Sequence, residues 1–180
     1  MKKFVVFAFG LVLFACNSVE QYRGSIDSLA SQWDEATTTV TDLANQVAQE
    51  KSSFAQMVSS MTLDETTVAA LPEDAKTKIM EAETAFQNSG QGFDELTTQV
   101  GDFVTNWQEK SAEITTLKDG LAAGKLESDT STQIADLTTL VSDATANVTA
   151  WKEKLDAIKS QVSDSHKNWS DLVAQLMPAK

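Results

Sequence analysis

The chain has 180 residues, with 14 basic and 26 acidic side chains and a formal net charge of −12. This acidic balance argues against nucleic-acid binding, because such binding needs clustered Lys and Arg to displace counterions. A single Cys excludes an intrachain disulfide and a multi-cysteine zinc site, and a single His disfavours His-based metal or triad chemistry. We therefore expect no cofactor and no metal. At 42% hydrophobic residues, the chain can still bury a substantial core.

The N-terminus has the organisation of an export signal. Lys2 and Lys3 precede an apolar segment over residues 4–15, and Cys16 follows it directly. Twelve apolar residues are too few to cross a bilayer, which takes about 20, but they are typical of a signal peptide. The final residues, Leu13-Phe14-Ala15-Cys16, place a branched apolar residue, a variable one and a small one before the cysteine. This pattern resembles the lipobox of bacterial lipoproteins.

The resemblance implies a lipoprotein signal peptide over residues 1–15, followed by a lipidated Cys16 and a short linker over 16–20. It implies diacylglyceryl transfer to Cys16, cleavage before it and acylation of the new N-terminus, and such chains anchor a protein stably to a membrane. Asn17 is not the Asp that retains lipoproteins in the inner membrane of enteric bacteria, so the analogy favours the outer membrane. An ordinary secretory signal with a chance cysteine is the alternative.

Apolar residues recur at alternating steps of three and four in three long runs, from Tyr22 to Met61, from Ile79 to Leu121 and from Ile134 to Leu176. This is the heptad seam of a coiled coil. It predicts helices over about 20–62, 72–122 and 130–177. Their expected end signals are a capping box at Thr62–Glu65, Pro72 at the first position of the second helix, Gly120 and Gly124 at its end, a capping box at Thr130–Gln133, and Met177-Pro178.

Short connections force neighbouring helices to run in opposite directions. The sequence therefore predicts an all-α domain over residues 21–177, an antiparallel up-down-up three-helix coiled-coil bundle with the shape of an elongated rod. The expected register pairs Trp33 with Trp107, Phe54 with Phe86, Trp107 with Ala144, and Val100 with Trp151. Closure of three seams within one chain favours a monomer.

Polar residues interrupt the seams at Glu50, Ser89 and Lys110. The expected register puts Glu50 beside Ser89, Gly90 and Lys159, and Lys110 at another level, which disfavours a catalytic pair. We interpret these residues as a polar core layer that specifies register at some cost in stability. The seam continues in phase through Ser89-Gly90-Gln91-Gly92, so we expect one continuous helix there, containing a hinge, a close contact with a partner or a tolerated weak point. His166 next to this seam has no second His or Cys with which to bind a metal.

No phosphate-binding loop, nucleophile elbow or paired-carboxylate cleft is present in the sequence. We therefore expect a non-catalytic, lipid-anchored protein of the bacterial cell envelope, facing the periplasm or the exterior. It would serve as a spacer or docking surface, with the membrane and a protein as partners and no nucleic acid. One alternative is a carrier of lipid or another hydrophobic ligand, whose amphipathic helices open. Another is a peptidoglycan tether through the C-terminal Lys180, a residue that resembles the linked lysine of an enteric outer-membrane lipoprotein.

Overall fold

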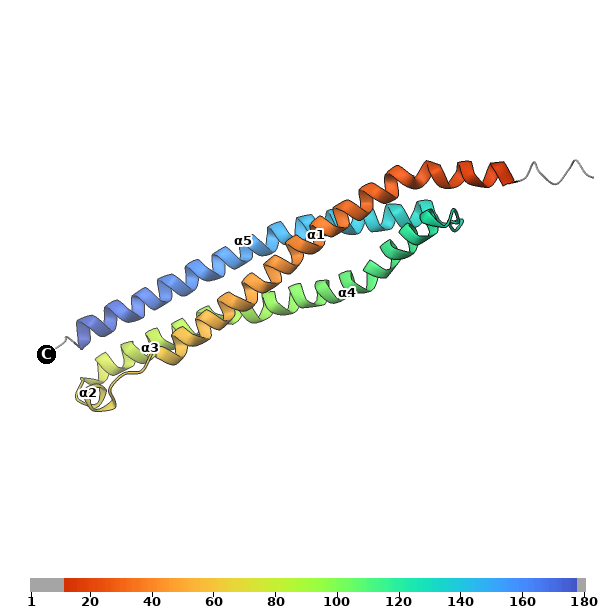
Figure 1. The fold of residues 1–180 in the computed structure, drawn as a ribbon. Coiled ribbons are helices and arrows are strands. Elements are labelled where there is room, and N and C mark those ends of the chain that lie inside the picture. Colours follow the sequence, from red (N-terminus) through yellow and green to blue (C-terminus); the bar gives the residue numbers. More distant parts are fainter. Residues whose placement is uncertain (1–11, 178–180) are drawn as a thin grey trace, which may run out of the picture. The chain divides into compact units, whose positions relative to one another are not determined.

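A computed structural model describes the backbone of residues 12–177 and the side chains of residues 19–177. All regular structure in this range is helical, so the all-α prediction is confirmed (Figure 1). The helices are α1 (Val12–Ser60), α2 (Glu65–Ala69), α3 (Glu73–Ser89), α4 (Gln91–Ala122) and α5 (Thr130–Leu176). The helix ends lie within about two residues of those expected, apart from two differences. The first is that α1 begins at Val12, so the expected linker over residues 16–20 belongs to this helix.

The second difference is a break at Gly90 within the predicted helix 72–122, so the expectation of one continuous helix was wrong. The buried Ser89 hydroxyl donates to the Phe86 carbonyl at 2.6 Å. That carbonyl would otherwise accept the Gly90 N–H in a regular helix, and this N–H bonds to Asn88 instead. Side chains that compete for backbone carbonyls, together with glycine, are a known cause of helix kinks.

At the starts of α2, α3 and α5, the capping residue is a neighbour of the one expected. Asp64, not Thr62, caps α2, because its carboxylate accepts the Thr67 N–H at 2.7 Å. At the start of α5, the carbonyl of Asp129 accepts the first backbone bonds, whereas the buried Thr130 hydroxyl donates to Glu127. Pro72 precedes the first residue of α3 and serves as its N-cap. The expected caps therefore lay in the right loops but one or two positions away.

The end of α4 matches the expectation. Gly124 has a φ of +67°, the left-handed conformation that favours glycine. The Lys125 N–H bonds to the Gly120 carbonyl at 2.8 Å, and the Gly124 N–H bonds to Leu121 at 3.2 Å. This pair of bonds is the Schellman arrangement, which satisfies carbonyls at the end of the helix and turns the chain toward α5.

Contacts divide the chain into two compact units. The first comprises Met1–Val40 and Phe103–Asn147, and the second comprises Thr41–Asp102 and Val148–Lys180. Each unit contains parts of α1, α4 and α5, and the second also contains α2 and α3.

The core of the first unit is built around two tryptophans. Trp33 of α1 and Trp107 of α4 stack with ring centroids 3.7 Å apart, as the expected register requires. The indole N–H of Trp33 bonds to Ser111 and that of Trp107 bonds to Thr37, so α1 and α4 run in opposite directions here. Apolar residues from all three helices complete this core; they include Ile26, Leu29, Val40, Ile114, Leu117, Leu137, Val141 and Ala144.

In the second unit, ion pairs and ring contacts fix the register. Lys51 of α1 pairs with Asp94 of α4, and Lys154 of α5 pairs with Glu95 of α4. The rings of Phe54 and Phe86 lie 5.3 Å apart, which confirms that expected pairing. The pairings of Trp107 with Ala144 and of Val100 with Trp151 stay predictions.

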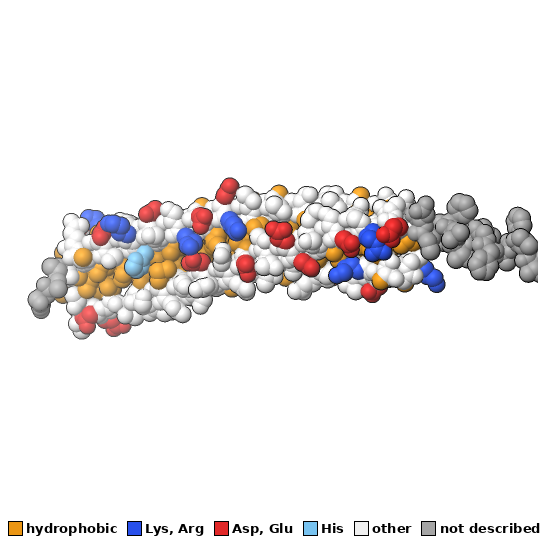
Figure 2. All heavy atoms as spheres, turned by 45° about the horizontal axis from the view of Figure 1, so that its top comes forward, with side chains coloured by type: hydrophobic (Ala, Val, Ile, Leu, Met, Phe, Trp, Pro, Cys, Tyr) orange, Lys and Arg blue, Asp and Glu red, His pale blue; other side chains and the backbone are white. Residues whose placement is uncertain are grey.

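The seam of the second unit is less completely covered toward the end of α5. Phe86, Phe93 and Leu96 are fully buried. By contrast, several expected seam residues are only half-buried, namely Phe54, Met57, Trp169, Leu172 and Leu176. Figure 2 shows hydrophobic side chains at the surface on both sides of the histidine.

Candidate functional site

Two of the residues singled out by the sequence fall outside the described side chains. Cys16 lies within the backbone span of α1, but its side chain lies outside the described part of the chain, as do residues 1–11 of the expected signal peptide. Lys180 also lies outside it. The lipidation and tether predictions therefore rest on sequence.

The expected polar layer is present in the second unit in part. Glu50 of α1 and Lys159 of α5 form an ion pair at 2.7 Å, which is the neighbour relation that the register predicted. The hydrogen bond from Lys159 to Glu50, with the attraction of that carboxylate, raises the pKa of Lys159 above its usual value. Both side chains keep substantial contact with solvent, so this is a surface pair that spans two helices rather than a buried one.

Lys110 does not join this layer. It belongs to the first unit, and its ammonium pairs at 2.6 Å with Glu113 on its own helix. The hydrogen bond to Glu113 raises the pKa of Lys110. Ser89 is buried, and its hydroxyl is used by the Phe86 carbonyl. Of the three expected residues, Glu50 pairs with another helix, Ser89 lies at the break in the α3–α4 segment and Lys110 forms a pair within its own helix.

The glycines next to Ser89 let two other helices approach closely. A Cβ on Gly90 would lie 2.1 Å from the Phe54 ring of α1, and a Cβ on Gly92 would lie 2.8 Å from Ile158 of α5. Real Cβ atoms do not come this close, so each glycine provides the space for one large side chain. The Ser-Gly-Gln-Gly segment is thus a point of close contact between the α3–α4 segment and both α1 and α5.

Aromatic rings surround this contact point. Phe54 lies between Phe86 and Phe93, with centroid distances of 5.3 and 5.9 Å. His166 of α5 contacts Phe86 edge-on at 5.3 Å and lies 6.0 Å from Trp169. His166 is therefore a packing residue of an aromatic cluster. Among the described residues, no group of three or more His, Cys, Asp or Glu side chains could hold a metal ion.

A shallow hollow of about 200 Å³ opens beside this cluster. Its lining combines the Glu50–Lys159 pair with Met57, Phe93, Val162, Ser163 and His166. Ligand pockets for drug-sized molecules usually enclose about 300–1,000 Å³. The hollow is below that range, and its two charges already neutralise each other.

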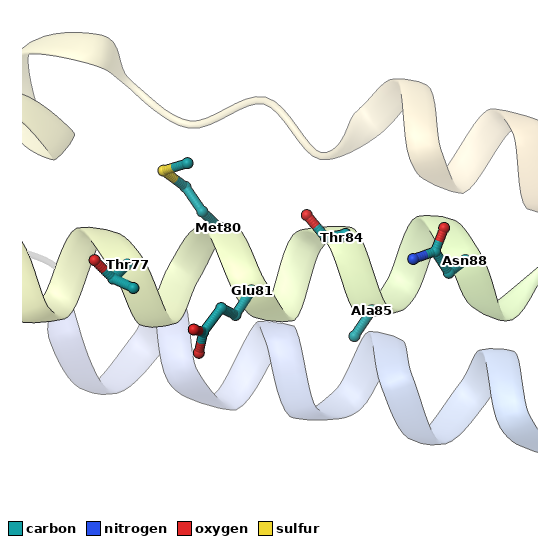
Figure 3. A pocket seen from close by; sticks show the side chains of 6 residues that line it. All are labelled: Thr77, Met80, Glu81, Thr84, Ala85 and Asn88. Carbon is teal, nitrogen blue, oxygen red and sulfur yellow. The ribbon is translucent and has the colours of Figure 1, made fainter.

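A larger hollow of about 450 Å³ lies along the outer face of α3. Its lining residues, Thr77, Met80, Glu81, Thr84, Ala85 and Asn88, all belong to this one helix (Figure 3). Met80 is a large hydrophobic residue with marked exposure, at 65%. A surface provided by one helix holds a ligand on one side only, so we regard it as an exposed helix face rather than a binding cavity.

A reciprocal pair of tryptophan–hydroxyl hydrogen bonds joins α1 and α4 in the first unit and was not predicted from the sequence. Thr37 accepts the Trp107 indole N–H and donates to the Trp33 carbonyl, and Ser111 accepts the Trp33 indole N–H and donates to the Trp107 carbonyl. Each tryptophan is thus followed, four residues later, by the hydroxyl that binds the other one. The repeated spacing Trp-x-x-x-Thr/Ser in the sequence is the signal that could have revealed it.

Within the described residues, none of the helices combines the length and apolar character needed to cross a bilayer. Comparison with protein-family models, with curated proteins and with solved structures finds no match for this chain.

Proposed function

We propose that this chain is a lipid-anchored lipoprotein of the bacterial cell envelope whose helical body has a structural or docking role without catalysis. The observation that carries the proposal is the lipobox-like Leu13-Phe14-Ala15-Cys16, which contains the single cysteine of the chain at the position of the lipid. Loss of Lys2 and Lys3 with the signal peptide makes the net charge −14, which anionic headgroups repel. The body would then be held at the membrane through its lipid alone.

The side-chain geometry supports a structural role for the body. Trp33 and Trp107 of the first unit stack on each other, and each indole N–H bonds to a hydroxyl on the other tryptophan's helix. In the second unit, the charged residues Lys51, Lys154 and Lys159 each bridge to a carboxylate on another helix. These polar and charged side chains are thus used in contacts between helices.

For the body as a whole we propose the antiparallel up-down-up three-helix coiled-coil arrangement. The opposite directions of contacting helices within each unit and the short connections between helices support it. Small-angle scattering of the purified protein, together with its mass in solution, tests this arrangement and the expected monomer. A compact globular scattering profile or a stable dimer would contradict them.

The anchoring is tested in cells by incorporation of a palmitate analogue and by membrane fractionation. The native chain should be labelled and sediment with outer membranes, whereas Cys16→Ser should be unlabelled. Asn17→Asp is the matched variant, because it keeps the lipid site and should move the labelled protein to the inner membrane. A labelled Cys16→Ser protein would refute lipidation at this residue.

Two further measurements separate the roles. Protease treatment of intact and lysed cells reports cleavage at the connection over residues 61–72: cleavage in intact cells favours surface docking, and protection until lysis favours a periplasmic spacer. Mixing residues 20–180, produced without the apolar segment 4–15 and without the lipid, with phospholipid vesicles tests the carrier alternative, because a structural body should remain unbound. Digests of the cell wall that contain only free Lys180 would exclude the tether.

A further inference from the structure

The junction between α3 and α4 lacks the bonding of a continuous helix. The Phe86 carbonyl accepts the Ser89 hydroxyl, and the Gly90 N–H bonds to the Asn88 carbonyl instead of the Phe86 carbonyl. The next turn restarts with a tighter bond from the Phe93 N–H to the Gly90 carbonyl at 3.0 Å. A helix that has lost its regular backbone bonds at a Ser-Gly pair bends more easily there than elsewhere.

The segments on the two sides of the junction are held differently. α2 buries none of its residues, and α3 buries two large side chains, Ile79 and Phe86, along with smaller ones. The α3 ion pair of Lys76 with Glu73 is internal to the helix. By contrast, Asp94 and Glu95 of α4 pair with α1 and α5. Segments with few large buried contacts open at the lowest free energy.

The pivot itself is firmly packed. Phe54 fills the space above Gly90 and contacts Phe93, and Ile158 fills the space above Gly92. Gly90 lies at the break and Gly92 lies in α4, so neither glycine contact involves α3. If α3 swings away, Phe54 can stay on Gly90 while Phe86 leaves the rings of Phe54 and His166.

The closed arrangement also carries a cost. The indole N–H of Trp169 is buried, and no atom of the described residues accepts it. A buried donor without an acceptor destabilises the arrangement that buries it. Trp169 lies one turn beyond His166 on α5, and His166 touches Phe86 of α3. Because α3 runs opposite to α5, the register places Trp169 at the level of α3, so opening of α3 would give water access to this group.

We propose that the α2–α3 segment, residues 65–89, is a flap that opens about the Ser89–Gly90 junction while α4 stays packed on α1 and α5. Opening uncovers the inner face of α3, including Ile79 and Phe86, and the aromatic surface around His166. The flap provides the second unit with a low-energy rearrangement that the continuous helices α1 and α5 do not have. Ser89 favours the open form, because a serine hydroxyl that bonds to a preceding carbonyl bends the helix and weakens its regular bonding at that point.

The test compares two buried positions by the rate of thiol labelling in the full chain with Cys16→Ser. Ile79 of α3 and Val100 of α4 are each 2% exposed and lie in the same unit. A cysteine at either site reacts only when that site opens, so the rate relative to the urea-unfolded protein reports the open fraction. Ile79→Cys should react at least about tenfold faster than Val100→Cys if the flap opens without the rest of the unit.

Adding Ser89→Ala removes the hydroxyl that bonds to Phe86 and so favours a regular bond from the N–H of residue 90 to the Phe86 carbonyl. It should slow the labelling of Ile79→Cys about fivefold, the effect of one hydrogen bond, and leave Val100→Cys unchanged. A second route is Gly90→Ala in a Phe54→Leu background, which removes the ring that blocks a Cβ. It should slow labelling at position 79 relative to Phe54→Leu alone.

Equal rates at positions 79 and 100 would show that the unit opens as a whole and would overturn the flap. Faster labelling at position 79 that neither Ser89→Ala nor Gly90→Ala slows would show opening elsewhere and would overturn the Ser89–Gly90 pivot.

Discussion

The paired Trp–hydroxyl contacts of the first unit offer the sharpest test of how its helices are held. Thr37→Val keeps the branched shape of the side chain but removes the oxygen that accepts the Trp107 indole N–H at 2.8 Å. Trp107 is 3% exposed, so water cannot replace this acceptor without a rearrangement. Leaving such a donor unsatisfied costs about 1–3 kcal/mol. For a chain of this size, each kcal/mol lowers Tm by about 2–4 °C.

Ser111→Ala should cost less than Thr37→Val. The bond from the Trp33 indole to Ser111 is longer, at 3.2 Å. In addition, Ala has a higher helix propensity than Ser, by about 0.5 kcal/mol, which offsets part of the loss. The expected order of destabilisation is therefore Thr37→Val first and Ser111→Ala second.

Thr38→Val is the matched control for the threonine change. Thr38 is exposed, and its hydroxyl donates to the Asp34 carbonyl, as the Thr37 hydroxyl donates to the Trp33 carbonyl. Thr38 therefore makes the same kind of hydroxyl-to-carbonyl bond as Thr37, but it is not the acceptor of the Trp107 indole N–H. Urea unfolding followed by the exciton signal of the stacked indoles reports on this unit specifically. Equal midpoints for Thr37→Val and Thr38→Val would refute the reasoning.

Three further predictions concern separate features. Gly101→Ala should stabilise the protein by about 0.5–1 kcal/mol, because the added Cβ meets nothing within 4 Å. Gly92→Ala should instead destabilise it by about 1–3 kcal/mol, because the added Cβ overpacks against Ile158. Thermal unfolding of the two variants compares these effects. Hydrogen bonds from threonine hydroxyls and a backbone N–H lower the pKa of Asp64 to about 2, so its contribution to α2 is present at neutral pH and is lost as the pH falls toward 2; an NMR titration giving the usual value near 3.9 would contradict this. Glu50→Gln should change the free energy of unfolding by less than about 1 kcal/mol, because the pair with Lys159 is solvated, and a much larger loss in a urea titration would show that the pair is effectively buried.

The sequence alone determined the helical class, the helix ends to within a few residues and the level at which the helices meet. Heptad spacing and end signals are local properties, and a short connection leaves a helix little choice but to return along its neighbour. This is why the heptad register alone predicts the contacts of Trp33 with Trp107, of Phe54 with Phe86 and of Glu50 with Lys159.

Only the tertiary structure decided how the Ser-Gly-Gln-Gly segment is used. Its seam phase is that of an unbroken helix, but at the break a serine hydroxyl bonds to the Phe86 carbonyl and a ring from another helix fills the space over Gly90. The same holds for the indole N–H groups: those of Trp33 and Trp107 bond to hydroxyls on the opposite helix, whereas that of Trp169 has no acceptor among the described residues. Such outcomes depend on distances between helices, which a periodic pattern does not contain.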